Sequence, residues 1–177
     1  MKVLLGVTGG VASKLTSKLV SKLSESGHEV KVVVTSSVKY FWENHDERLE
    51  VYTDKDEWAG DKYIPDSPIA HIELGKWADV LLICPLTANT LAKIANGLAD
   101  NLLTCAARAW DSKKPVVIAP AMNTKMWIHP VTGEHIEKIK SWFPLKVVGP
   151  ISKKLACGDT GIGALANLED IVLVIKK

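Results

Sequence analysis

Short runs of apolar, mostly β-branched residues alternate along the chain with segments in which apolar residues recur every third or fourth position. The first pattern is typical of buried strands and the second of helices that bury one face. The short runs predict strands at residues 2–7, 29–34, 49–52, 80–84, 114–118 and 145–148.

The helical pattern begins directly after the first strand, where one face carries Val11, Leu15, Leu19 and Leu23. A strand, a helix and a strand in so few residues predict a right-handed parallel crossover. Further helical patterns occupy residues 91–97, 98–110, 132–141 and the segment from Leu168 to Ile175. We therefore predict an α/β fold, a Rossmann-like or flavodoxin-like three-layer sandwich with a mainly parallel sheet of about six strands.

Three segments fit this scheme less well. Residues 38–46 predict a short amphipathic helix, and the charged, Gly- and Pro-containing residues 54–68 predict a functional or interface loop. Residues 155–164 are too rich in glycine for a regular element, so we predict a flexible flap with Cys157 near its base.

Small polar residues follow four of the predicted strands, at Thr8-Gly9-Gly10, Thr35-Ser36-Ser37, 85–90 and 120–123. In open parallel sheets, ligands bind beyond the carboxyl ends of the strands, where backbone N–H groups and helix N-termini favour phosphate. The chain has neither a Gly-x-Gly-x-x-Gly nor a Walker sequence, and no acidic residue follows the second strand. A mononucleotide phosphate or polyol chain therefore fits better than NAD, although plain helix caps and packing glycines remain alternatives.

Three side chains could carry chemistry. Asn123 offers a donor and an acceptor without changing protonation state, His71 could carry a proton near neutral pH, and Cys157 could act from the flap. The structural alternatives are a helix cap for Asn123, a buried histidine and an inert cysteine. Three other histidines have polar neighbours, which predicts that they are solvated: His28, His45 and His135.

Composition narrows the function classes. The 177 residues are 47% hydrophobic, which favours one domain over residues 1–177, and the net charge of +2 gives no nucleic-acid footprint. No apolar run is long enough for a membrane span, and the N-terminus lacks the regions of a signal peptide. The three widely spaced cysteines suit neither disulfides nor a metal site, and they indicate a reducing cytoplasm.

Five ordered motifs together resemble the phosphopantothenoylcysteine decarboxylase branch of the homo-oligomeric flavin-containing cysteine decarboxylases. They lie at residues 71–79 (HIELGKWAD), 89–104 (NTLAKIANGLADNLLT), 108–111 (RAWD), 120–127 (PAMNTKMW) and 156–164 (ACGDTGIGA). The resemblance covers nearly the whole chain. It is closest to the stand-alone form of these enzymes, since no synthetase domain follows.

The resemblance implies FMN as the cofactor, 4′-phosphopantothenoylcysteine as the substrate and 4′-phosphopantetheine, a coenzyme A precursor, as the product. It also implies a homotrimer or a larger assembly, with His71 as the active-site histidine, Asn123 as the substrate-binding residue and Cys157 as the acid that protonates an ene-thiol. The implied FMN contacts are Gly9, Gly10, Val11, Thr35, Ser37, Thr87, Ala88, Asn89, Thr90 and Ala121. Gly10 departs from the family pattern, in which many members have serine.

Two other functions are compatible with this resemblance. A peptidyl-cysteine decarboxylase would release the ene-thiol without reducing it, but such enzymes differ around the position of Cys157. A flavoprotein-like regulatory subunit of a phosphatase would usually carry long acidic or low-complexity extensions, and this chain has none.

Overall fold

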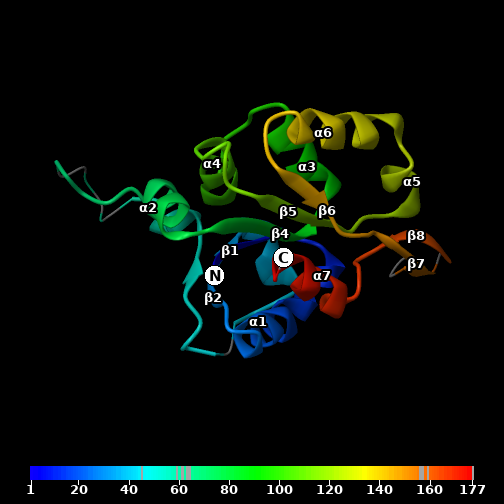
Figure 1. The fold of residues 1–177 in the computed structure, drawn as a ribbon, viewed down its shortest axis with the longest axis horizontal. Coiled ribbons are helices and arrows are strands. Elements are labelled where there is room, and N and C mark those ends of the chain that lie inside the picture. Colours follow the sequence, from blue (N-terminus) through cyan, green and yellow to red (C-terminus); the bar gives the residue numbers. More distant parts are fainter. Residues whose placement is uncertain are drawn as a thin grey trace.

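Within the described residues, a six-stranded sheet has the order β3-β2-β1-β4-β5-β6, and every neighbouring pair in it is parallel (Figure 1). The computed structural model describes residues 1–44, 46–58, 60, 62, 65–155, 158 and 160–176. The strands are β1 (Lys2–Val7), β2 (Glu29–Val34), β3 (Val51–Tyr52), β4 (Val80–Leu86), β5 (Val116–Pro120) and β6 (Leu145–Val147). The predicted parallel α/β fold is confirmed.

Helices cover both faces of this sheet, with α1 and α7 on one side and α3, α4 and α6 on the other (Figure 1). The α-helices are α1 (Thr16–Glu25), α2 (Ala70–Trp77), α3 (Ala88–Ala95), α4 (Leu102–Arg108), α5 (Thr124–Trp127), α6 (Pro130–Lys140) and α7 (Leu168–Ile175). Short 3-10 helices are η1 (Val11–Leu15), η2 (Ser36–Tyr40) and η3 (Asp54–Asp56).

Strand β1 shows how the apolar pattern builds both layers. Its alternate residues Val3, Leu5 and Val7 pack in the same cluster as α1 and α7, while Leu4 packs with α3 and α4 on the other face. Each fully buried Leu or Val side chain contributes roughly 1.5–3 kcal/mol relative to exposure. Gly6 lets α4 approach closely, because a Cβ there would lie 2.5 Å from Leu103 Cδ1.

Two local predictions were wrong. Residues 38–46 do not form an amphipathic α-helix; the chain makes the 3-10 helix η2 at Ser36–Tyr40 instead. The glycine-rich segment 155–164 is not wholly irregular, since β8 (Thr160–Ala164) pairs antiparallel with β7 (Ile151–Lys154). Gly161 and Gly163 serve close packing against α5 and the residues before it, which a sequence pattern does not distinguish from flexibility.

The prediction for His28 was also wrong, because this side chain is buried and neither ring nitrogen has a hydrogen-bond partner among the described residues. Burial lowers the pKa of His28, and the nearby N-terminal amine and Lys176 lower it further. His135 lies partly exposed against Asn96, and His45 falls outside the described residues. Within the described part of the chain, no helix combines the length and apolar character needed to cross a bilayer.

Candidate active site

The ends of β1 and β4 are joined by one buried hydroxyl. Thr8 has no exposed surface, and its Oγ1 donates to the Pro85 carbonyl at 2.7 Å while accepting from the Thr87 N–H at 2.9 Å. Both partners lie more than 70 residues away in the sequence. This single side chain therefore fixes the turn after β1 against the turn after β4.

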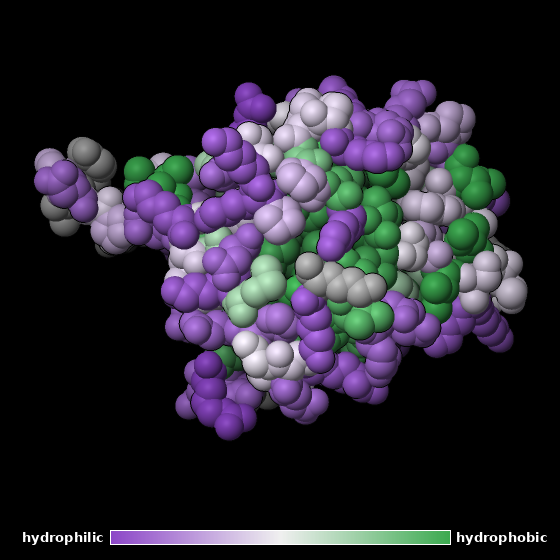
Figure 2. Space-filling view, viewed as in Figure 1, coloured by the Kyte–Doolittle hydropathy of each residue, from purple (hydrophilic) through white to green (hydrophobic). Residues whose placement is uncertain are grey.

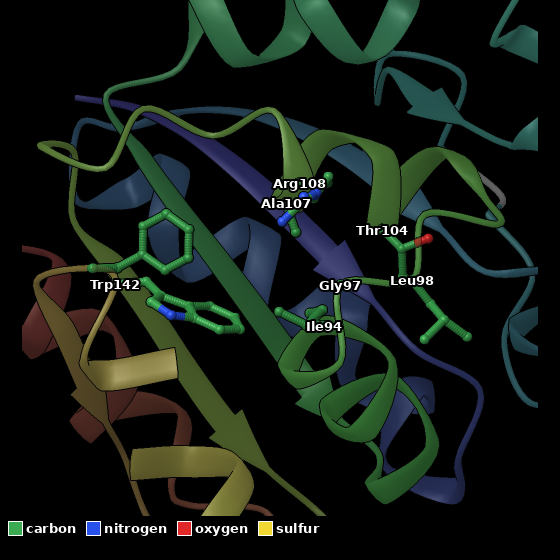
Figure 3. A pocket seen from close by; sticks show the side chains of 8 residues that line it. Ile94, Gly97, Leu98, Thr104, Ala107, Arg108 and Trp142 are labelled. Atoms are coloured by element: carbon green, nitrogen blue, oxygen red, sulfur yellow. The ribbon is translucent and has the colours of Figure 1, made fainter. Parts of the chain in front are cut away.

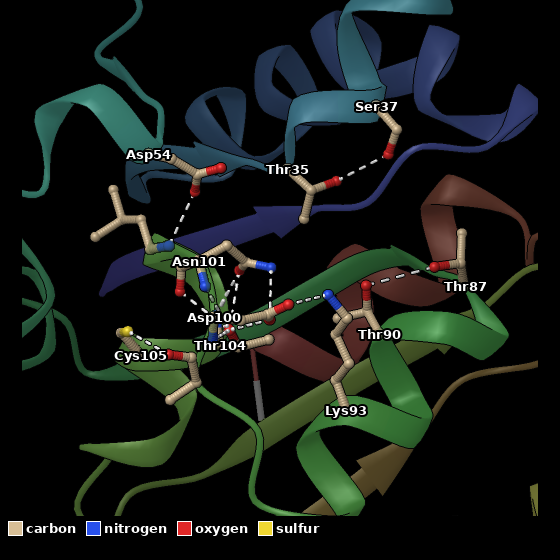
Figure 4. Close-up of polar contacts among 12 residues, drawn as sticks. Thr35, Ser37, Asp54, Thr87, Thr90, Lys93, Asp100, Asn101, Thr104 and Cys105 are labelled. Atoms are coloured by element: carbon tan, nitrogen blue, oxygen red, sulfur yellow. Dashed lines mark hydrogen bonds and ion pairs between the residues drawn. The ribbon is translucent and has the colours of Figure 1, made fainter.

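The end of β2 joins the same group of turns. Thr35 Oγ1 accepts from the Gly9 N–H at 3.2 Å and lies 3.4 Å from Ser37 Oγ (Figure 4). Gly9 cannot carry a side chain here, because a Cβ would lie 2.1 Å from Ser37 Oγ. Thus the structure brings together three of the predicted turns, 8–10, 35–37 and 87–90.

The helices that open from these turns suit an anion. Neither η1 nor α3 has a side chain that caps its first N–H groups, and neither carries an acidic residue in its first turn. The Thr87 and Thr90 hydroxyls lie 3.5 Å apart at the start of α3 (Figure 4). Uncapped N–H groups and neutral hydroxyls are the donors that bind phosphate at helix N-termini.

Asn123 follows β5 and begins α5. Its Oδ1 accepts from the Lys125 N–H at 2.9 Å, so the helix cap considered from the sequence is present. Ala121 is held beside β4, because its N–H donates to the Leu86 carbonyl at 3.0 Å. The side-chain oxygen of Asn123 thus acts as an acceptor, and its amide NH2 can act only as a donor.

The β7–β8 hairpin packs directly on this segment. The Met122 N–H donates to the Gly163 carbonyl at 2.9 Å, and a Cβ on Gly163 would lie 2.2 Å from the Met122 carbonyl oxygen. A Cβ on Gly161 would lie 2.5 Å from Thr124 Oγ1. Cys157 lies outside the described residues.

His71 is not part of this group within one chain. It lies in the first turn of α2, where its Nδ1 bonds to Glu57 Oε1. Figure 1 draws α2 on the left of the molecule and α5 with the β7–β8 hairpin on the right. The chain therefore holds His71 and Asn123 on opposite sides of the molecule.

The Glu57 carboxylate beside His71 was not identified from the sequence, and two further carboxylates lie around the neighbouring Cys105. Asp54 Oδ1 accepts from the Leu102 N–H at 2.9 Å and so fastens η3 to the start of α4 (Figure 4). Burial raises the pKa of the Cys105 thiol, and the charges of Glu57, Asp100 and Asp54 raise it further. The only sequence signal for Glu57 was its position in the irregular segment 54–68.

Polar contacts continue from the strand-end turns toward α4. Lys93 Nζ lies 2.5 Å from Asp100 Oδ2, and Asn101 caps α4 by accepting from the Thr104 N–H at 2.9 Å (Figure 4). These bonds order the segment between α3 and α4. Among the described residues, no group of three or more His, Cys, Asp or Glu side chains could hold a metal ion.

A hollow between α3, α4 and the end of α6 is separate from this site (Figure 3). Its volume of about 30 Å³ is far below the roughly 300–1,000 Å³ of pockets that hold small ligands and cofactors. The lining residues are Ile94, Gly97, Leu98, Thr104, Ala107, Arg108, Trp142 and Phe143. The strand-end turns, not this hollow, form the candidate active site.

Comparison with known proteins identifies the family of this chain. A family model described as Flavoprotein matches residues 1–177. The chain belongs to the flavoprotein family. A relative of this flavoprotein, phosphopantothenoylcysteine decarboxylase from Mus musculus, is 48% identical over 176 residues, which cover 99% of this chain and 85% of the relative.

Solved structures agree with this membership in the flavoprotein family. The chain is similar to a mutant PPC decarboxylase complexed with pantothenoylaminoethenethiol, with a TM-score of 0.93 and 45% identity over 99% of this chain and 96% of that one. It is also similar to the FMN binding protein AtHal3, with a TM-score of 0.89 and 45% identity over 99% of this chain and 94% of that one. The six-stranded flavoprotein fold predicted from the sequence is thus that of known family members.

Proposed function

We propose that the protein is an FMN-dependent decarboxylase that converts 4′-phosphopantothenoylcysteine into 4′-phosphopantetheine, a coenzyme A precursor. The observation that carries this proposal is the similarity, at 45% identity over 99% of the chain, to a PPC decarboxylase that holds pantothenoylaminoethenethiol. That ligand is an ene-thiol, the kind of compound left when a cysteine-derived group loses CO2 after oxidation. The protein acts in the cytoplasm, a compartment that suits its unpaired cysteines.

The strand-end turns fit an FMN phosphate. Gly9 and Gly10 expose the backbone after β1, and Thr35, Ser37, Thr87 and Thr90 supply hydroxyls around it. The uncapped starts of η1 and α3 add N–H donors. Val11, Ala88, Asn89 and Ala121 complete the set of residues that hold the cofactor.

The chemistry divides between the cofactor and the chain. When bound, FMN would supply the oxidation of the substrate's cysteine side chain, without which the electron pair left by CO2 would have no acceptor, and in its reduced form the hydride that the ene-thiol needs to become 4′-phosphopantetheine. The Asn123 amide NH2 binds the substrate carboxylate or the adjoining amide, and Oδ1 stays bonded to the Lys125 N–H. His71 moves a proton near the substrate thiol, and Cys157 donates a proton to the ene-thiol.

The active site is completed by a second copy of the chain. His71 and Asn123 lie on opposite sides of one subunit, so one copy alone cannot bring them to the same substrate. Exposed apolar residues accompany both, since Trp58 and Ile69 bridge each other just before α2, and Met126 and Ile128 lie in and directly after α5. Figure 2 shows hydrophobic surface toward both ends of the molecule, where Figure 1 draws α2 and α5. Head-to-tail contacts of this kind close into rings, and a homotrimer is the ring that we propose.

The test is an assay of the purified protein with 4′-phosphopantothenoylcysteine. We expect yellow protein with one non-covalent FMN per chain, release of CO2 and a product with the mass of 4′-phosphopantetheine. Colourless protein that does not take up added FMN would contradict the cofactor assignment. An ene-thiol product from a peptide ending in cysteine, with no turnover of phosphopantothenoylcysteine, would favour the peptidyl-cysteine decarboxylase instead. FMN uptake without turnover of either would favour the regulatory subunit.

The role of Cys157 predicts a change of product. A serine hydroxyl is of similar size but far less acidic than a thiol, so Cys157→Ser is expected to release CO2 and to stop at the ene-thiol. Mass spectrometry under anaerobic conditions distinguishes the ene-thiol from 4′-phosphopantetheine, which contains the hydrogens added in the final reduction. Reduced product formed by Cys157→Ser at the wild-type rate would remove Cys157 from the mechanism.

A further inference from the structure

A buried carboxylate contacts the histidine of the proposed reaction. Glu57 Oε1 bonds to His71 Nδ1, and the two side chains keep only 9% and 20% of their surfaces exposed. The other carboxylate oxygen, Glu57 Oε2, is buried and has no hydrogen-bond partner among the described residues. Among the described residues, the bond to His71 is thus the one side-chain hydrogen bond of this buried acid.

The burial of the Glu57 carboxylate costs free energy of folding. A buried carboxylate loses its hydration, and a single hydrogen bond compensates only part of that loss. The backbone already holds the segment in place, because the Glu57 carbonyl accepts from the Ala70 N–H at 3.3 Å and Trp58 forms a bridge with Ile69. The Glu57 side chain is therefore not required to attach its segment to α2.

We propose that Glu57 is the positioning residue for His71, and that it makes Nε2 the nitrogen that handles the proton. This inference rests on the decarboxylase function proposed above. An ionised carboxylate can only accept, so the proton of a neutral His71 ring must lie on Nδ1. Nε2 then presents its lone pair away from Glu57 and can take a proton. Once it has done so, the carboxylate stabilises the resulting imidazolium, as carboxylates do for histidines in other active sites.

Neighbouring groups do not replace Glu57 in this role. Asp54 is engaged with the Leu102 N–H, and Asp100 is paired with Lys93. The Cys105 thiol donates to the Ala99 carbonyl at 3.3 Å, and its raised pKa keeps it neutral. Among these acids, Glu57 is the one bonded to the imidazole.

The first test is the tautomer of His71, which does not depend on substrate. Long-range 15N–1H spectra of 15N-histidine-labelled protein identify the protonated nitrogen, and the spectrum of His71→Asn assigns the His71 signals. We expect the neutral ring to carry its proton on Nδ1 in the wild-type protein. In Glu57→Gln, we expect the proton to be distributed over both nitrogens. A wild-type ring protonated on Nε2 would overturn the proposal, even if Glu57→Gln failed to fold.

The second test measures how fast each variant releases CO2 from 4′-phosphopantothenoylcysteine. Loss of the carboxylate behind a metal-bound histidine costs about 10- to 100-fold, and we expect a fall of at least this size for Glu57→Gln with FMN content unchanged. Glu73→Gln is the matched control, since Glu73 also lies in α2 but is exposed and bonded to Lys76. This control should retain the wild-type rate.

The outcomes separate the positioning role from the proposed function. A wild-type rate in folded Glu57→Gln would overturn the role of Glu57, as would a lower rate with the Nδ1 proton still in place. If the wild-type protein did not act on phosphopantothenoylcysteine, the proposed function would fail, while the tautomer would still report whether Glu57 orients the ring.

Discussion

Oligomers assembled from equal amounts of His71→Asn and Asn123→Asp subunits are expected to recover about a quarter of wild-type activity, although each variant alone is inactive. The reason is geometric. His71 in α2 and Asn123 before α5 lie on opposite sides of one subunit, so each proposed site takes its histidine from one copy and its asparagine from the next. In a random mixture, about one pair in four combines an intact His71 with an intact Asn123.

The two substitutions are chosen to leave the fold intact. Asn123 Oδ1 caps α5 through the Lys125 N–H, and aspartate is an equally good cap, so Asn123→Asp keeps this bond while placing a negative charge beside the substrate carboxylate. His71→Asn keeps much of the side-chain volume but cannot carry a proton at neutral pH. Both variants should therefore fold, bind FMN and fail in catalysis.

The experiment co-expresses the two variants with different affinity tags, isolates the mixed oligomers and measures CO2 release, with the oligomer mass determined by light scattering. A chain carrying both substitutions, mixed equally with wild type, is the control. Sites between copies predict about a quarter of the activity in that control, whereas sites within one chain predict about half. No recovery in the first mixture, or half activity in the control, would contradict the shared site.

The parallel sheet could be predicted from the sequence because its strands are short, nearly continuous apolar runs buried on both faces. The same logic places the turns after these strands at one edge of the sheet, since the carboxyl ends of parallel strands meet there. The hydrogen bonds of Thr8 and Thr35 bear this out. What the apolar pattern dictates is therefore the location of the turns that follow the strands.

Features set by contacts distant in sequence could not be predicted. Glu57 meets His71 across an irregular segment without periodicity, so no spacing rule joins them. His28 is flanked by polar residues, yet the fold buries it near the chain's N-terminal amine and Lys176. Gly161 and Gly163 suggested flexibility, but they stand where β8 touches Met122 and Thr124. In each case tertiary packing decides what local composition leaves open.

Gly9→Ala is expected to weaken FMN binding by about 10- to 100-fold, whereas Gly10→Ala, one residue later, should leave it nearly unchanged. A Cβ on Gly9 would lie 2.1 Å from Ser37 Oγ and 2.7 Å from the Ser37 backbone carbonyl carbon. A side chain can rotate away, but the backbone here is held, because the Thr35 N–H donates to the Val7 carbonyl and the Val38 N–H to the Thr35 carbonyl. The turn after β1 must therefore move away from the turn after β2.

Moving this turn disturbs the proposed phosphate site because Gly9 donates to Thr35 Oγ1. Overpacking of this kind costs about 1–3 kcal/mol. If the strain is relieved only when the two turns separate, FMN binding must restore it, and the affinity for FMN falls by about the expected 10- to 100-fold. Gly10 is different. Its backbone is extended, with φ of −161°, and its nearest neighbour would be Thr87 Cγ2 at 3.4 Å, an ordinary contact.

Fluorescence titration of the apoproteins with FMN measures both affinities, and circular dichroism establishes that each variant is folded before titration. Equal binding by Gly9→Ala and wild type would mean that the turns after β1 and β2 do not form the phosphate site. An equal loss in both variants would mean that the cofactor itself, rather than Ser37, excludes side chains from the turn. A loss confined to Gly9→Ala is expected, because only there does the added carbon meet backbone that cannot yield.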